Sequence, residues 1–261
     1  MDWAKMPITK IKEYIAEYED QLPQEIEEAL ACDTRKGVVD LLKQIQLKRE
    51  HRRKQERMWH EMSIYEQNLR NQGKTIILGI DEVGRGPLAG PVVACAVALP
   101  ANFYLPGLND SKKVPLTTRQ AFYEIIMRDA LFVGIGTIDA KRIDEINILE
   151  ATREAMVQAV SNTGCTPDVC LIDAVHIPNL SYEQIPIIGG DGKSISIAAA
   201  SIVAKVTRDN MMEEYANLYP GYGFDKNAGY GTQEHLAALR SMGPTPIHRM
   251  TFGGVKEEQI G

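Results

Sequence analysis

Two apolar segments enclose the motif Gly79-Ile80-Asp81-Glu82-Val83-Gly84-Arg85-Gly86-Pro87. The segment before it is Ile76-Ile77-Leu78, and the segment after it is Pro91-Val92-Val93-Ala94-Cys95-Ala96-Val97. This pattern predicts a strand, a tight glycine-rich loop and a second strand. Side chains alternate between the two faces of a strand, so Asp81 and Glu82 serve one site only if Glu82 lies where the strand gives way to the loop. The glycines also let backbone N–H groups approach a ligand.

A second apolar run ends in an aspartate in the same way. Cys170-Leu171-Ile172-Asp173 has the form of Leu78-Gly79-Ile80-Asp81. If these strands are parallel neighbours, both carboxylates emerge at the edge where α/β sheets place their sites. A single aspartate that closes a strand is more often a turn or cap residue. With Glu82 and the loop residue Asp191, however, the set comprises four carboxylates, whose mutual repulsion a hard divalent cation would relieve.

The N-terminal part of the chain is predicted to be all-helical. From Thr9 to Asn71 there is no strand candidate, Gly37 interrupts the pattern, and Asn71-Gln72-Gly73 is the expected boundary between segments 1–72 and 73–261. Seven basic residues and only two acidic ones lie between Lys43 and Arg57. A solvated helix face and a surface that follows phosphates explain this run equally well.

The rest of the chain alternates strand and helix patterns. Thr117-x-x-Gln120 predicts a capping box that opens a helix to about Asp129. Further elements are expected as a strand over 130–138, a short helix capped by Asp139, a helix opened by Asn147 that ends near Gly164, strands over 169–172 and 185–188, a long helix from about Ser194 to Leu218 and a last helix between Thr232 and Met242. Interleaved strands and helices predict an α/β layer fold.

Composition limits the class of protein. The chain has 261 residues and a net charge of −6, which argues against a generally basic nucleic-acid binder, so phosphate contacts must come from local patches. The four cysteines form no C-x-x-C pair, and Cys95 and Cys170 are expected in the core. We expect a reducing, cytoplasmic location, because the N-terminus lacks the apolar stretch of a signal peptide and no segment is long enough to span a membrane.

Several motifs together resemble the type 2 ribonucleases H (the ribonuclease HII family). The resemblance covers roughly residues 73 to 255 in the order of the family. Its motifs are the Asp81 to Pro87 stretch, Leu108-Asn109-Asp110-Ser111-Lys112-Lys113, Leu171-Ile172-Asp173, Gly190-Asp191-Gly192-Lys193-Ser194, the 198–209 segment, Gly229-Tyr230-Gly231-Thr232 and Pro246-Ile247-His248-Arg249. It implies an RNase H-like mixed sheet flanked by helices, preceded by a helical extension, which is the bacterial form.

The resemblance also implies a reaction and a site. The reaction is metal-dependent hydrolysis of RNA in RNA–DNA hybrids, with incision 5′ of single ribonucleotides in duplex DNA, 3′-hydroxyl and 5′-phosphate products, and Mg²⁺ or Mn²⁺ as cofactor. Asp81, Glu82, Asp173 and Asp191 match the catalytic, metal-binding carboxylates. The implied substrate-binding residues are Gly84, Arg85, Gly86, Ser111, Lys112, Lys113, Ser201, Lys205 and Tyr230.

Simpler interpretations exist for most of these residues. Arg85 on its own is a turn arginine, the lysines are surface residues, and Lys205 with Asp209 is a surface ion pair at helical spacing. Most tyrosines are half-buried, whereas Tyr230 between two glycines is expected to be exposed. His248 is expected to be structural or at the margin of the site. One departure from the family is Ala228, where many relatives carry lysine.

Other functions were weighed against a nuclease. The dinucleotide-type loop that begins at Gly84 has a displaced last glycine and no following helix, and Gly192-Lys193-Ser194 lacks the earlier glycine of a P-loop. The remaining alternatives are a ribonuclease HIII-like hybrid nuclease without single-ribonucleotide incision and a non-catalytic hybrid-binding module. We expect a monomer that acts on hybrids and on DNA duplexes with embedded ribonucleotides.

Overall fold

The computed structural model describes residues 3–18 and 22–256. The chain divides into two compact units, Met1–Met58 and Trp59–Gly261. The long helix α3 (Lys36–Met62) belongs to both, since its last turn lies in the second unit. Among the described residues, no helix is both long and apolar enough to cross a membrane.

The first unit is a small helical assembly. It contains η1 (Trp3–Lys5), α1 (Ile8–Ala16), α2 (Gln24–Ala31) and the greater part of α3. Its core consists of Ile11, Ile15, Leu22, Leu30, Val38, Leu42 and Ile45. Gly37 lies in the first turn of α3 and does not interrupt the helical pattern there. A Cβ at Gly37 would lie 2.8 Å from Cδ1 of Ile8, so the glycine permits close packing of helices.

The basic stretch of α3 is largely exposed. Lys43, Lys48, Arg52, Arg53, Lys54 and Arg57 are exposed. Arg49 pairs with Glu27 of α2, and Arg52 pairs with Glu56 at 3.2 Å. The stretch is therefore a solvated face with most of its positive charge available.

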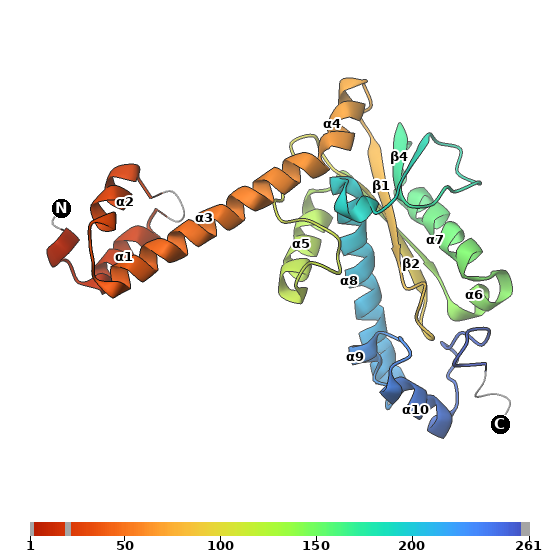
Figure 1. Cartoon of the computed structure of the whole chain (residues 1–261). Coiled ribbons are helices and arrows are strands. Elements are labelled where there is room, and N and C mark those ends of the chain that lie inside the picture. The colour runs from red at the N-terminus through yellow and green to blue at the C-terminus, as the bar shows by residue number, and fades with distance from the viewer. Residues whose placement is uncertain (1–2, 19–21, 257–261) are drawn as a thin grey trace. The chain divides into compact units, whose positions relative to one another are not determined.

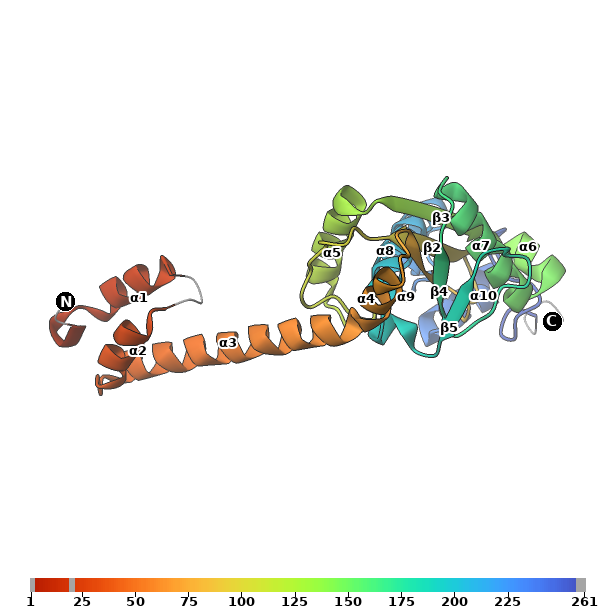
Figure 2. The ribbon, with the colours of Figure 1, turned by 90° about the horizontal axis from the view of Figure 1, so that it is seen from above.

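The second unit is built on a mixed five-stranded sheet (Figures 1 and 2). Its strands are β1 (Ile77–Val83), β2 (Val92–Ala98), β3 (Phe132–Ile138), β4 (Val169–Asp173) and β5 (Gln184–Ile187). The order is β3-β2-β1-β4-β5. Strand β1 pairs antiparallel with β2 and parallel with β4, so the condition under which the two strand-end aspartates share one edge is met.

Helices cover both faces of this sheet (Figure 1). The helices of the second unit are α4 (Ile64–Asn71), α5 (Leu116–Asp129), α6 (Ala140–Ile146), α7 (Ile148–Asn162), η2 (Gly190–Gly192), α8 (Ile195–Leu218), α9 (Phe224–Asn227) and α10 (Gln233–Met242). Helix α7 covers one face of the sheet and α8 the other, whereas α5 and α9 pack on α8. Leu78, Ile80 and Ile172 pack with the buried residues of α7, whereas Ile77 and Leu171 pack with Ile197 of α8. Alternate residues of β1 and β4 therefore face opposite helices.

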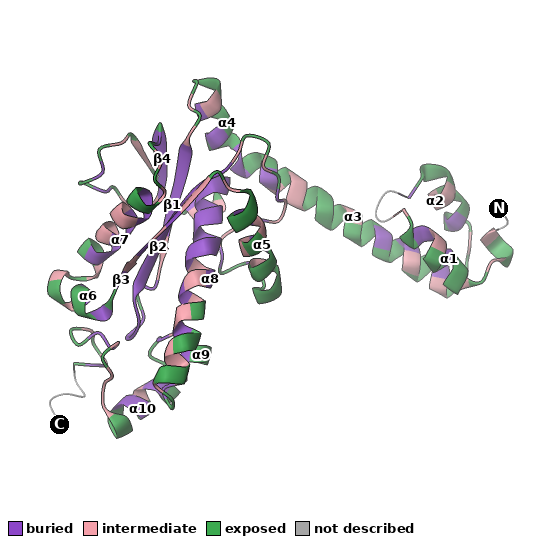
Figure 3. Cartoon of the chain, turned by 180° about the vertical axis from the view of Figure 1, so that it is seen from behind, coloured by how far each residue is buried: buried purple, intermediate pink, exposed green. Residues whose placement is uncertain are grey.

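Glycines let the two main helices lie directly on the strands. A Cβ at Gly79 would be 2.0 Å from the carbonyl carbon of Ser196, and one at Gly136 would be 1.9 Å from the carbonyl oxygen of Ala155. The first half of α8 is consequently buried (Figure 3). Cys95 and Cys170 lie in the core as expected.

Most predicted helix starts are confirmed, and one is wrong. Asp139 accepts a hydrogen bond from the N–H of Arg142, and Asn147 accepts from Leu149 and Glu150. The predicted capping box at Thr117 does not form, because α5 begins at Leu116 after Pro115 and has no side-chain cap. Proline is well suited to this place, where its missing N–H is not needed. The short helix α9 had no sequence prediction.

Candidate active site

Two aspartates lie side by side where β1 and β4 run parallel. The register pairs Leu78 with Cys170 and Ile80 with Ile172, so Asp81 and Asp173 are the next positions on the two strands. Because paired residues of parallel strands point to the same face, both carboxylates lie on the face that α8 covers. The sequence prediction of one shared edge is confirmed for these two residues.

Asp81 is buried and held by hydrogen bonds. Its side chain is 5% exposed, accepts a hydrogen bond from the N–H of Glu82 at 2.8 Å and bonds to Ser201 of α8. Burial, followed by the neighbouring Glu82 and by Asp173, raises the pKa of Asp81 well above its usual value. The site thus disfavours a bare negative charge at Asp81, as expected where carboxylates repel one another in a poorly solvated place.

Glu82 lies at the end of β1, which is the position that the sequence pattern requires if it is to share a site with Asp81. The strand continues to Val83, so Glu82 is the next-to-last strand residue and is expected to point away from Asp81. Its carboxylate nevertheless interacts with Asp173, and burial is the main cause that raises its pKa. Arg85 opposes this shift from 3.4 Å, as an ion-pair partner. The end of the sheet brings Glu82 into the group.

Asp191 completes the group from η2. Asp173 Oδ1 accepts from the N–H of Gly190 at 2.7 Å, which fixes the turn that carries Asp191 against the end of β4. Burial, then Asp110 and Asp173, raises the pKa of Asp191, while Lys112 opposes the shift. Asp110 also shares a side-chain hydrogen bond with Asp191. Sequence reasoning missed Asp110 as a member of the site, although it stands in a motif that was recognised.

The four carboxylates are suitable ligands for a hard divalent cation, but their side chains are spread apart. Within residues 3–18 and 22–256, no three His, Cys, Asp or Glu side chains are gathered closely enough to hold an ion as they stand. The chemistry still fits, since all four predicted ligands offer carboxylate oxygens and three of them have a raised pKa. A bound cation would compensate the repulsion between these carboxylates.

The loop over residues 109–113 contacts both the carboxylates and α8. Ser111 is 4% exposed, and its hydroxyl lies 3.0 Å from that of Ser201 in a hydrogen bond, so Ser111 is no ordinary surface residue. Lys113 pairs with Asp110 at 3.5 Å. Lys112 opposes the rise in the pKa of both Glu82 and Asp191, so its positive charge lies near these carboxylates.

Lys205 and Asp209 of α8 form the expected ion pair. Lys205 Nζ lies 2.6 Å from Asp209 Oδ1. Arg119 of α5 joins them at 3.6 Å from Asp209. The positive charge of Lys205 is therefore paired with Asp209, and its side chain is only partly exposed.

Two buried arginines hold the glycine-rich loop. The guanidinium of Arg208 donates to the carbonyl oxygens of Pro91 at 2.9 Å and Ala89 at 3.1 Å. That of Arg249 donates to the carbonyl oxygens of Arg85 at 3.0 Å and Gly90 at 2.9 Å, and also to that of Gly84. Burial is the first cause that lowers the pKa of Arg208 to about 10 and of Arg249 to about 9. Sequence reasoning missed this role for both arginines.

Tyr230 stands beside this loop and is 47% exposed, as predicted. A Cβ at Gly86 would lie 3.5 Å from its Cε1 atom, so the ring borders the loop directly. Behind it, His235 Nδ1 lies 2.9 Å from the carbonyl oxygen of Tyr230, and His235 Nε2 lies 3.0 Å from His248 Nε2. His248 Nδ1 accepts from the N–H of Thr245, so the network assigns both rings as neutral tautomers, with His248 structural.

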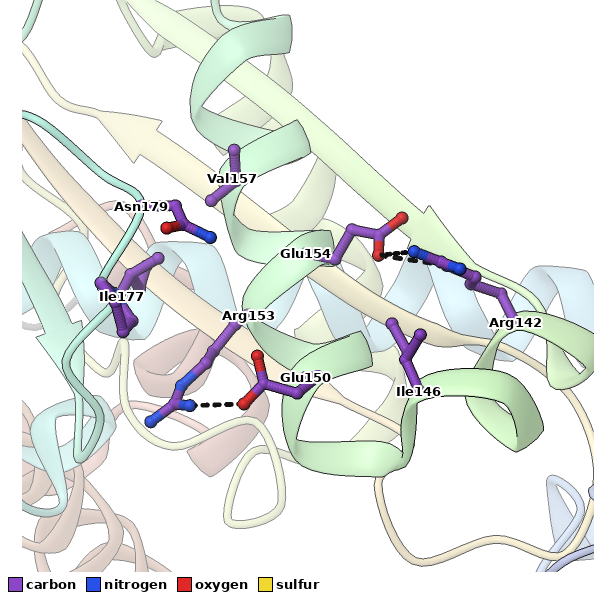
Figure 4. A pocket seen from close by; sticks show the side chains of 9 residues that line it. Arg142, Ile146, Glu150, Arg153, Glu154, Val157, Ile177 and Asn179 are labelled. Atoms are coloured by element: carbon purple, nitrogen blue, oxygen red, sulfur yellow. Dashed lines mark hydrogen bonds and ion pairs between the residues drawn. The ribbon is translucent and has the colours of Figure 1, made fainter.

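A hollow of about 330 Å³ lies elsewhere in this unit (Figure 4). It is lined by residues of α6, α7 and the 177–179 loop, and none of the four carboxylates contributes to it. Its arginines are compensated, because Arg142 pairs with Glu154 at 3.1 Å and Arg153 pairs with Glu150 at 2.6 Å. The strand-end cluster is the better candidate site.

Comparisons with known proteins identify the family of the chain. The family model described as Ribonuclease HII matches residues 78–255, and that described as Ribonuclease HII N-terminal domain matches residues 7–70. Ribonuclease HII of Bacillus pumilus (strain SAFR-032) is 51% identical over 249 residues, which cover 95% of this chain and 97% of the relative. Ribonuclease HII of Bacillus cereus (strain Q1) is 48% identical and covers 95% and 94%.

A solved structure supports the fold. The ribonuclease H2 of Pyrococcus horikoshii OT3 matches with a TM-score of 0.60 at 23% sequence identity, covering 71% of this chain and 97% of that chain. The expected RNase H-like arrangement is thereby confirmed. The chain belongs to the ribonuclease HII family and is a ribonuclease H, an enzyme that hydrolyses RNA in RNA–DNA hybrids.

Proposed function

We propose that this ribonuclease H also incises duplex DNA on the 5′ side of a single embedded ribonucleotide, leaving 3′-hydroxyl and 5′-phosphate ends. The observation that carries the proposal is continuity. The strand that bears Asp81 and Glu82 runs directly into the Gly84–Gly86 loop, and Gly86 borders the exposed ring of Tyr230. A cut phosphate at the carboxylates would therefore have its neighbouring sugar at this loop.

The proposed chemistry is hydrolysis of a phosphodiester with Asp81, Glu82, Asp173 and Asp191 as the acting carboxylates. Mg²⁺ or Mn²⁺ bound by these oxygens would supply charge stabilisation at the phosphate and lower the pKa of the attacking water. The carboxylates orient that water, and the bond that breaks is the one to the 3′ oxygen of the preceding nucleotide. Because the group is open, we expect its side chains to move together when the cation binds.

The proposed specificity comes from close approach to one sugar. A ribose 2′-hydroxyl both donates and accepts hydrogen bonds, so backbone groups of the Gly84–Gly86 loop can distinguish it from deoxyribose. Arg249 holds the carbonyls of Gly84 and Arg85 in this loop, and Arg208 holds those of Ala89 and Pro91 just after it, so the outward groups of the loop are fixed in advance. Tyr230 would contact the adjoining deoxyribose. Together these contacts would read one junction between RNA and DNA.

Phosphate contacts are proposed for Arg85, Lys112, Lys113 and Lys205. Ser111 and Ser201 are buried and are proposed to serve substrate binding by holding the loop. The exposed basic face of α3 is proposed to add sequence-independent phosphate contacts. We keep residues 1–72 as the proposed extension and 73–261 as the proposed catalytic domain.

The decisive experiment uses three duplexes: DNA with one ribonucleotide, a continuous RNA–DNA hybrid, and plain DNA. Each is incubated with the protein with and without Mg²⁺ or Mn²⁺, and the products are separated on a sequencing gel. Tyr230→Ala should lose cleavage of the single-ribonucleotide duplex more than cleavage of the hybrid. Tyr104→Ala, which removes another exposed tyrosine, is the control. If the hybrid is cut while the singly substituted duplex stays intact with either metal, single-ribonucleotide incision is excluded.

A further inference from the structure

A buried glutamate outside the carboxylate group connects to it through the main chain. Glu66 of α4 is 0% exposed. It lies within the part that matches the N-terminal family model and outside the 78–255 match. Its Oε1 accepts hydrogen bonds from the Ser194 hydroxyl at 2.6 Å and from the Ser196 N–H at 3.0 Å.

These two bonds fix the start of α8. Ser194 is the N-cap of that helix, and its hydroxyl oxygen accepts from the N–H of Ile197 at 3.2 Å. The first N–H groups of a helix have no partner within the helix, and a negative charge at that end is favourable. Burial removes the hydration of a carboxylate, so the two bonds to Oε1 are what hold Glu66 in one position.

The start of α8 carries the turn that contains Asp191. The N–H of Ser194 donates to the carbonyl oxygen of Gly190 at 2.8 Å. The N–H of Gly190 in turn donates to Asp173 Oδ1 at 2.7 Å. Ser194 is thus one hydrogen bond from Glu66, Gly190 two and Asp173 three, and Asp191 directly follows Gly190. A shift of the helix start therefore moves Asp191 relative to Asp173.

We propose that Glu66 is a positioning residue for the reaction, which holds the Gly190–Ser194 turn so that Asp191 meets the other carboxylates. This inference rests on the proposed function, because it requires Asp191 to act on the phosphodiester. It gives the part of the chain before the catalytic family match a direct influence on turnover, apart from any contact with nucleic acid.

The test compares Glu66→Ala, Glu66→Gln, Ser194→Ala and the double variant Glu66→Ala/Ser194→Ala. Gln67→Ala, an exposed position on the same helix, is the matched control. Steady-state cleavage of a hybrid is measured at a temperature where circular dichroism shows every variant folded, and Mn²⁺ binding is measured by calorimetry without substrate. We expect Glu66→Ala to lower kcat by about 10- to 100-fold and to weaken Mn²⁺ binding by about 10-fold, with KM changed by less than about 3-fold.

Glu66→Gln keeps an acceptor for both serines and should retain kcat within about 3-fold of the parent protein. The kcat of the double variant should be no lower than that of Glu66→Ala alone, since both changes remove the same hydrogen bond between Ser194 and Glu66. If Glu66→Ala fails to fold, Ser194→Ala and Glu66→Gln decide by the same readouts. Asp191→Asn separates the two ideas. Normal turnover in Asp191→Asn would overturn the proposed function, whereas an inactive Asp191→Asn with normal kcat and Mn²⁺ binding in the Glu66 and Ser194 variants would overturn the positioning role alone.

Discussion

Replacing Gly86 with alanine should impair substrate recognition without harming the fold. The backbone at Gly86 is not left-handed, and an added Cβ would lie 3.5 Å from Cε1 of Tyr230, an ordinary contact. We therefore expect the free energy of unfolding to stay the same or to rise by up to about 1 kcal/mol. The new methyl group would stand between the loop and the sugar. A loss of at least about 10-fold in kcat/KM for the single-ribonucleotide duplex, which is about 1.4 kcal/mol, should follow.

Gly84→Ala is the informative contrast. Gly84 has φ +92°, and its Cβ would lie 2.3 Å from Nε of Arg208 and 2.7 Å from the carbonyl oxygen of Pro91. The left-handed backbone costs about 1–2 kcal/mol, and the clash with buried groups adds about 1–3 kcal/mol. At about 2–4 °C for each kcal/mol in a protein of this size, the melting temperature should fall by roughly 5–15 °C.

Melting is followed by circular dichroism, and cleavage by gel analysis of singly substituted and all-RNA hybrid duplexes. The expected pattern is a stable, poorly active Gly86→Ala and a destabilised Gly84→Ala that is impaired on both substrates. A Gly86→Ala protein that is as active as its parent on the single-ribonucleotide duplex would show that the sugar does not approach this loop. Equal losses of stability in both variants would refute the packing argument.

Three other perturbations test separate parts of the structure. Replacing any one proposed catalytic carboxylate with its amide should lower turnover by orders of magnitude; the variants are Asp81→Asn, Glu82→Gln, Asp173→Asn and Asp191→Asn. Calorimetry of each metal-free variant should show the same or greater stability, because a repelling charge is removed. Deletion of residues 1–58 should raise KM and flatten the salt dependence of binding with little change in kcat, which filter binding at several salt concentrations checks. Deletion of residues 1–72 should also destabilise the protein, which urea unfolding checks, because it removes the buried residues Trp59, Met62, Glu66 and Leu69. Burial lowers the pKa of His248 to about 4, so between about pH 6.5 and pH 4 the unfolded chain binds more protons than the folded one. The free energy of unfolding should therefore decrease by up to about 3 kcal/mol as the pH is lowered through this range. Urea unfolding at several pH values should find a smaller decrease in His248→Gln.

Local patterns predicted the elements that their own residues determine. Asp139 and Asn147 were recognised as helix caps, and the two apolar runs that each end in aspartate were recognised as strands, although their parallel pairing was only a condition of the argument. The exact end of β1 was not predicted, because it depends on β2, which pairs with β1 as far as Val83. Pairing between distant segments decides such boundaries, and a single segment does not contain that information.

The missed residues share a physical cause. Glu66 lies in a helix among exposed positions, and only the distant start of α8 makes it a buried partner. Arg208 and Arg249 read as ordinary charged residues, yet each is almost fully buried against backbone carbonyls. Asp110 lies in a motif that was recognised, but its interaction with Asp191 depends on the fold. Each role arises from a contact over a long sequence separation.

Helix α8 provides one frame for both the proposed chemistry and the proposed recognition. Its Ser201 bonds to Asp81, and its Arg208, about 10 Å further along the helix, bonds to the carbonyls behind the glycine-rich loop. The separation between the cleaved phosphate and the sugar that is read would then be set by a rigid helix rather than by a flexible loop. Gly79 lets this helix lie directly on β1, so its height above the sheet is fixed as well. A single 2′-hydroxyl offers little binding energy, so it can direct cleavage only if the loop and the carboxylates keep a constant spacing, and this helix supplies that constancy.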